Sequence, residues 1–181
     1  MIISSTGMPD NAGENDISKN ILTMGLGELG LWKRGVMADP ALFKQLFQNI
    51  FSADHRLAWR SCWIIDTASE DYPGLLSDKL SPIITALLST RDGSLKRHFT
   101  RILCRYEVPE ESLGLIIDRC FELLLPAEPA AVRVNAMQLL FNISQKNPDL
   151  KGELKSVIET LMEEGGSAGF INRCKKLLRK L

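Results

Sequence analysis

One apolar pattern recurs four times along this chain, at an interval of 37 or 38 residues. Within each copy, positions i, i+4, i+7 and i+8 lie on one face of an α-helix, because the helix turns once every 3.6 residues. The copies are Leu57, Ser61, Ile64, Ile65, Ala68; Leu95, Phe99, Ile102, Leu103, Tyr106; Val132, Ala136, Leu139, Leu140, Ile143; and Phe170, Cys174, Leu177, Leu178. Such a fixed interval predicts an array of stacked structural repeats. Equivalent positions such as Ile64, Ile102, Leu139 and Leu177 are expected to form one buried seam.

A second apolar segment lies between successive copies and predicts the other helix of each pair. These segments occupy residues 75–88, 113–124 and 150–162, and Pro82 is expected to kink the first or to delay its start. Prolines and glycines fall between the helical segments, where they end one helix and begin the next. The alternation of apolar and polar residues that marks a strand does not persist. The sequence therefore predicts an all-α protein.

These helical segments resemble the HEAT and armadillo repeat families over about residues 54–181. The resemblance is carried by Leu57-Ala58-Trp59-Arg60, by Ala131-Val132-Arg133-Val134-Asn135-Ala136 and by the regular length of the helix pair. The chain also looks like small stand-alone bacterial members of that group. The resemblance implies a right-handed α-α superhelix, that is, a solenoid of antiparallel helix pairs of about 37–38 residues. It implies the fold rather than a particular activity.

The segments predict one repeat domain over residues 15–181, preceded by a polar, Gly-rich tail at 1–14 that we expect to be disordered. Residues 15–53 are expected to form N-terminal cap helices that cover the open end of the solenoid. The helix at 39–53 begins with Asp39 as N-cap and Pro40 in its first position. The predicted helix pairs and the C-terminal capping helix occupy residues 54–90, 92–126, 129–163 and 167–181.

Charge and hydropathy exclude several classes of function. The chain has 22 Lys and Arg and 22 Asp and Glu, so the whole molecule has no net field that attracts nucleic acid or a membrane. No apolar run reaches the roughly 20 residues of a membrane-spanning helix, and the N-terminus lacks the features of a secretory signal. We therefore expect a cytoplasmic protein that does not bind membranes.

The four cysteines are scattered along the chain. They form no Cys-x-x-Cys pair, and no histidine lies at a spacing typical of a metal site. We interpret Cys62, Cys104, Cys120 and Cys174 as small apolar side chains in a reducing compartment, and we expect no metal and no cofactor. Gly165–Gly169 is Gly-rich and opens the last helix, where its free N–H groups could hold an anion. A flexible connector with Ser167 as N-cap is the preferred interpretation.

Two enzyme interpretations have some support in the residues. Ser4–Asn11 resembles the mobile loop of the fumarase and adenylosuccinate lyase superfamily, but the lysine of that loop is missing and the chain is too short for such an enzyme. Trp59, Trp63 and Asp66 lie near Arg56 and Arg60, which are the ingredients of an alkylpurine glycosylase. The alternative is that both tryptophans pack at the junction with helix 39–53. We expect no enzymatic activity.

A polar stripe remains on the first helix of each pair, beside the apolar seam. Its members are three or four residues apart, so they share one side of each helix. They are Arg60, Trp63, Thr67; His98, Arg101, Arg105; Asn135, Gln138, Asn142; and Arg173, Lys176, Lys180. One interpretation is an ordinary solvated face. The other is a docking strip for an acidic peptide, an acidic protein or a phosphate backbone.

The sequence thus favours a non-catalytic protein-interaction module that is a monomer or a weak dimer. Its expected partner is a protein or peptide, with an acidic one as the specific candidate. Nucleic-acid binding through the basic part of the polar stripe is the main alternative, and an enzyme is the third.

Overall fold

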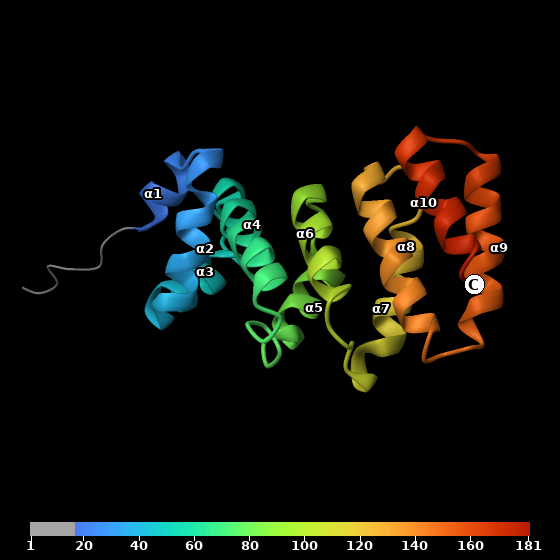
Figure 1. Cartoon of the computed structure of the whole chain (residues 1–181), viewed down its shortest axis with the longest axis horizontal. Helices are drawn as coiled ribbons and strands as arrows, with labels where there is room; N and C mark the ends of the chain where they lie inside the picture. Colours follow the sequence, from blue (N-terminus) through green and yellow to red (C-terminus); the bar gives the residue numbers. More distant parts are fainter. Residues whose placement is uncertain (1–16) are drawn as a thin grey trace, which may run out of the picture.

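The computed structural model describes residues 17–181, and every regular element in that range is helical. The prediction of an all-α solenoid is confirmed. The expected disordered tail at 1–14 and the lyase-like segment Ser4–Asn11 lie outside the described residues. From the N-terminus to the C-terminus, the helices lie side by side in an elongated row (Figure 1).

Short helices close the N-terminal end of the row. They are α1 (Ile17–Thr23), the 3-10 helix η1 (Leu26–Glu28), α2 (Leu29–Ala38) and α3 (Pro40–Asn49). Asp39 begins α3 as predicted: its Oδ1 accepts the Ala41 N–H at 2.8 Å, and Pro40 takes the first helical position. The helix ends at Asn49, earlier than the predicted residue 53. Residues 50–54 form a turn instead, because the Ser52 hydroxyl accepts the N–H of Asp54, which caps the next helix.

Seven helices follow the N-terminal cap. They are α4 (His55–Asp71), α5 (Leu80–Ser89), α6 (Gly93–Leu103), α7 (Glu110–Glu122), α8 (Ala130–Ser144), α9 (Leu150–Glu163) and α10 (Ala168–Leu178). The start of α5 is delayed from Leu75 to Leu80, which places Pro82 in the first turn. A proline is tolerated there because the first N–H groups of a helix have no partner within it. Ser167 caps α10 as predicted, with its Oγ accepting the Phe170 N–H.

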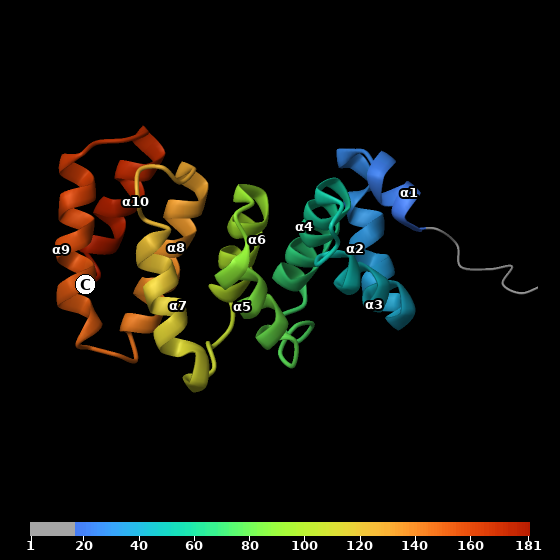
Figure 2. The ribbon, with the colours of Figure 1, turned by 180° about the vertical axis from the view of Figure 1, so that it is seen from behind.

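The helices form two layers. One layer holds α4, α6, α8 and α10 in sequence, and the other holds α5, α7 and α9, as the two opposite views show (Figures 1 and 2). Within the described chain, α5 packs against α6 rather than α4, and α7 packs against α8 rather than α6. The packed pairs are therefore α3–α4, α5–α6, α7–α8 and α9–α10. The predicted ranges 54–90 and 92–126 instead pair α4 with α5 and α6 with α7, and neither of these two pairs is packed together.

The apolar seam of the first layer is fully buried. Ile64, Ile102, Leu139 and Leu177 are exposed by 0%, 0%, 1% and 2% of their surface, as the repeat interval predicts. Phe99 and Phe170 are also buried and fill the spaces between these helices. Each helix of the layer thus contributes the same face to one continuous core, which confirms the alignment of the repeats.

Arginines link neighbouring helices by donating to carbonyl groups at helix ends, with bonds of 2.8–3.1 Å. Those carbonyls have no partner within their own helix, and a cation is favoured at the negative end of the helix dipole. The bonds run from Arg60 to Ile21 and Met24, from Arg119 to Leu87 and Thr90, and from Arg133 to Leu124. They fasten α1 to α4, α5 to α7 and the end of α7 to α8.

We predict that Ile102→Ala or Leu139→Ala lowers the free energy of unfolding by about 2–5 kcal/mol, because each leaves a cavity in the seam. Chemical denaturation measures this difference. Leu115→Ala is the matched control, since Leu115 is 57% exposed on α7 and its truncation should change stability by less than about 0.5 kcal/mol. Equal effects of seam and control substitutions would contradict the buried seam.

Candidate partner-binding groove

The centre of the polar stripe is organised around a buried carboxylate, Asp66 on α4, which is 0% exposed. Its Oδ2 accepts hydrogen bonds from His98 Nδ1 and Arg101 Nε, both at 2.7 Å, and its Oδ1 accepts one from Arg105 Nη2 at 2.5 Å. Arg105 Nη2 also donates to the Asp66 backbone carbonyl and to Ser69 Oγ. Burial would raise the pKa of Asp66, but the hydrogen bonds from His98 and Arg105 outweigh it and hold the pKa below its ordinary value.

This cluster determines what three members of the stripe can do. His98 is 3% exposed and its Nδ1 faces Asp66, so it offers very little surface to a partner although it lines a cavity. The side chains of Arg101 and Arg105 are 34% and 21% exposed. One carboxylate faces two permanent cations, so the cluster retains a net positive charge at the molecular surface. Sequence reasoning missed Asp66 as the acceptor, although its position beside Ile65 on the apolar face was a signal of burial.

Polar side chains continue the connections across α8 and α10. Asn135 and Asn142 donate to backbone carbonyls of α6, and Gln138 joins Asn142 to Arg173. The bonds are Asn135 Nδ2 to Arg97 O (3.0 Å), Asn142 Nδ2 to Cys104 O (2.9 Å), Gln138 Nε2 to Asn142 Oδ1 (2.7 Å) and Arg173 Nη1 to Gln138 Oε1 (3.0 Å). Much of the stripe therefore holds the first layer together, in addition to any role at the surface.

The two tryptophans of α4 line a cavity of about 590 Å³ at the N-terminal end of the layer. Their ring centres lie 6.2 Å apart with an angle of 28° between the planes, and the Arg60 guanidinium lies 5.4 Å from the centre of the Trp59 ring. Met24, Gly25 and Leu26 form one wall, and Ser94, Arg97 and His98 of α6 form another. The sequence placed these rings at the junction with helix 39–53, whereas the structure places them on the cavity between α1–η1 and α6.

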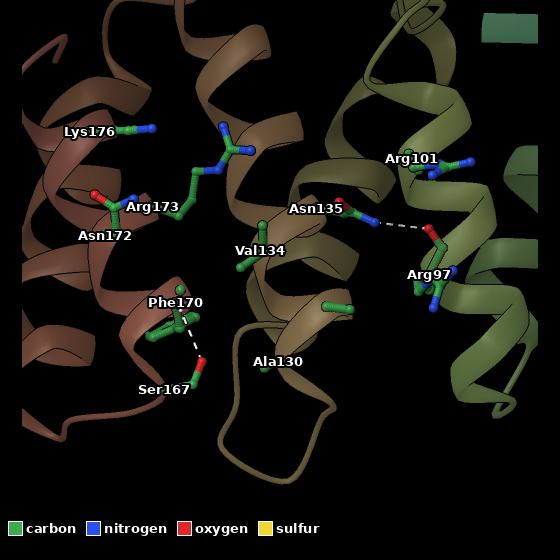
Figure 3. Close-up of a pocket in the computed structure, with 12 residues that line it drawn as sticks. Arg97, Arg101, Ala130, Val134, Asn135, Ser167, Phe170, Asn172, Arg173 and Lys176 are labelled. Carbon is green, nitrogen blue, oxygen red and sulfur yellow. Dashed lines mark hydrogen bonds between the residues drawn. The ribbon is translucent and has the colours of Figure 1, made fainter. Parts of the chain in front are cut away.

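A second cavity of about 510 Å³ crosses α6, α8 and α10 (Figure 3). Its cations are Arg97 and Arg101 from α6, and Arg173 and Lys176 from α10. The rest of its wall is made by Ala130, Ala131, Val134, Asn135, Ser167, Gly169, Phe170 and Asn172. Arg97 lines both cavities, so they are neighbours along the first layer, and we call the two cavities together the basic groove.

The groove is positive along its whole length. Its walls carry five arginines and lysines, namely Arg60, Arg97, Arg101, Arg173 and Lys176, and no aspartate or glutamate among the described residues. Arg97 and Lys176 are exposed, and within residues 17–181 their side chains form no hydrogen bond or ion pair. Arg97 was absent from the predicted stripe, but its spacing of four from Arg101 was a signal that both share a helix face.

Other members of the stripe lie away from the groove. Arg105 and Asn142 line a separate cavity of about 440 Å³ near the α6–α7 connection, and Lys180 lines neither cavity of the groove. Thr67 donates to the carbonyl of Trp63 within its own helix. The structure thus brings Arg60, Trp63, His98, Arg101, Asn135, Arg173 and Lys176 to the groove walls.

The described residues offer little for redox or metal chemistry. Burial raises the pKa of the Cys104 thiol to about 12, and it also raises the pKa of Cys62, Cys120 and Cys174 above the ordinary value. These thiols therefore stay protonated near neutral pH. Among residues 17–181, no group of three or more His, Cys, Asp or Glu side chains could hold a metal ion. None of the helices described there is long and apolar enough to span a bilayer.

We predict that Asp66→Asn lowers the free energy of unfolding at neutral pH by about 3–5 kcal/mol, because Arg101 and Arg105 lose their buried counter-charge. Asp71→Asn on the same helix is the control. Asp71 is 49% exposed and pairs with Lys33, so its loss should cost about 0–1 kcal/mol.

The effect should depend on pH, because the folded-state pKa of Asp66 is depressed. Its stabilisation is complete above the ordinary aspartate pKa of about 3.9 and is lost as pH falls through the lower folded value. The gap between wild type and Asp66→Asn should therefore narrow from about pH 5 downwards in denaturation curves. A constant gap down to pH 2 would contradict the charged state of Asp66.

The comparisons with known proteins agree with this architecture. A family model described as the HEAT repeat domain matches residues 31–181, a stretch that begins within α2 and includes every helix from α3 to α10. No curated protein and no solved structure matches the chain. On the extent of the family match, the chain belongs to the HEAT repeat domain family.

Proposed function

We propose that this chain is a non-catalytic interaction module that binds an acidic segment of a partner protein in the basic groove. Stacked helical repeats present an extended surface to a partner. The groove supplies such a surface on the first layer, from α1–η1 through α4, α6 and α8 to α10. Its length suits a segment of chain better than a single small molecule.

The observation that carries this proposal is the separation of charge. The chain has equal numbers of acidic and basic residues, yet within residues 17–181 the groove is lined by five cations and no carboxylate. A wall with one sign of charge attracts the opposite sign and repels partners of its own sign. Arg97 and Lys176 also have no counter-ion within the described fold, so an acidic partner would provide their first one.

Nucleic acid is the second candidate, because tryptophans beside cations are typical of single-strand binding sites. The arrangement of the rings favours a protein partner. Trp59 and Trp63 stack on each other with an angle of 28° between their planes, and Arg60 lies over Trp59, so fewer ring faces remain for successive bases to stack on. The neutral net charge also gives weak long-range attraction for a polyanion.

The residues do not support a glycosylase site. Asp66, the carboxylate that such chemistry would require, is buried beneath His98, Arg101 and Arg105 and lines neither cavity of the groove. A base held beside the tryptophans would meet cations, apolar groups and His98, whose Nδ1 is already bonded to Asp66, but no carboxylate among the lining residues. Binding therefore accounts for the groove better than catalysis does.

We predict that Arg97→Glu with Lys176→Glu weakens binding of a fluorescein-labelled peptide rich in Asp and Glu by about tenfold or more at low salt. Fluorescence anisotropy measures the affinity. Arg101 is left unchanged because reversing its charge would also disrupt Asp66. Wild-type affinity should decrease as salt is added.

The matched control is Arg91→Glu with Lys175→Glu. Both residues are exposed, neither lines the groove, and the change in net charge is the same. Equal losses in the two double variants would indicate general electrostatics and contradict the groove. Tighter binding of a labelled oligonucleotide than of the peptide, with loss only in the groove variant, would favour the nucleic-acid candidate.

A further inference from the structure

We infer that the bound segment carries one aromatic or long aliphatic side chain, which enters the tryptophan cavity about four to six residues from its acidic residues. This inference rests on the proposed function and adds a second contact to it. The basic groove would then have an apolar subsite at its N-terminal end and an anionic subsite at its C-terminal end.

The apolar subsite is formed by side chains that the fold leaves partly uncovered. Leu26 is 81% exposed on the rim of the cavity, and the half-buried rings of Trp59 and Trp63 form its base with Met24. Partly buried aromatic rings and an exposed leucine lose contact with water when an apolar side chain covers them. The volume of about 590 Å³ accommodates an aromatic side chain.

The nature of the walls selects an amphipathic occupant. Among the described residues, the charged side chains that line this cavity are Arg60 and Arg97, and the nearby Glu28 carboxylate is bonded to the Gly25 N–H, so an aromatic anchor with acidic neighbours fits better than a basic one. Arg60 is itself fastened to the Ile21 and Met24 carbonyls, which fixes the α1–η1 wall against α4. The subsite is therefore pre-formed, which reduces the ordering that binding requires.

The spacing follows from the stacking of the first layer. The apolar subsite lies between α4 and α6, and the anionic subsite lies across α6, α8 and α10, with Arg97 on the boundary. Packed helices lie roughly 8–10 Å apart. The centres of the two subsites lie about one and a half to two helix spacings apart, which corresponds to roughly 12–20 Å. An extended chain advances roughly 3.3 Å per residue, which gives about four to six residues between the anchor and the acidic group.

A peptide series tests this inference. Each labelled peptide has one Asp-Asp-Glu cluster in a Gly-Ser background and a single Trp placed at increasing offsets on either side, and the reference has Ser in place of Trp. Anisotropy titrations should show affinity rising by about tenfold over the reference at offsets near four to six on one side, and less at shorter or longer offsets.

Leu26→Ser should remove at least about threefold of that gain and leave the affinity for the Trp-free reference unchanged. Leu26 is so exposed that its loss should not affect folding, which thermal unfolding checks. Leu115→Ser is the matched control, because Leu115 is also an exposed leucine but lies on α7 in the other layer, and it should change nothing.

The outcomes separate this inference from the proposed function. If the reference peptide binds through Arg97 and Lys176 but no offset improves it, the apolar subsite is wrong and the acidic-segment proposal stands. A gain that is the same at every offset, or that survives Leu26→Ser, also overturns the subsite. If neither the reference nor any Trp peptide binds, the proposed function fails and the inference fails with it.

Discussion

The arrangement of the first layer depends on the bonds that Asp66 makes across the boundary between α4 and α6. Contacts between apolar residues such as Ile64 and Ile102 have little directional preference, so they favour burial without fixing one helix against the next. The carboxylate adds direction, because three donors reach it from α6 and from the residues just after that helix. They are His98 and Arg101 within α6, and Arg105 beyond its end. Only one rotation and one height of α6 satisfy all three donors together.

The groove follows from that constraint. Arg101 is turned toward α4 by its bond to Asp66, which leaves Arg97, one helical turn earlier, on the boundary between the two cavities. The same alignment lets Asn135 donate to the Arg97 carbonyl, so α8 is fixed against α6 (Figure 3). Gln138 then holds Arg173 of α10. Residues that join the helices therefore also set the positions of the cations on the surface.

Much of the fold could be predicted from the sequence, because the information lies within single helices. The apolar interval gave the seam at Ile64 and Ile102, and the Asp39 and Ser167 caps are local motifs. The site was less predictable, because its contacts join residues about one repeat apart. Nothing local shows that Asp66 binds Arg105, or that Trp59 faces the α1–η1 turn instead of α3. The packing of α5 on α6 likewise depends on tertiary contacts.

The cations of this chain have two different roles. Where they serve the fold they meet an acceptor, as Lys96 meets Glu128 at 2.5 Å and Arg133 meets the Leu124 carbonyl. Of the groove cations, Arg101 is the one that meets a carboxylate within residues 17–181, and that carboxylate is shared with Arg105. Like charges placed along one wall repel one another, which disfavours the fold slightly unless an anion binds there. Arg60, Arg101 and Arg173 of the groove each have an acceptor in the fold, so among the described residues Arg97 and Lys176 are the groove cations that the proposed acidic partner would pair with.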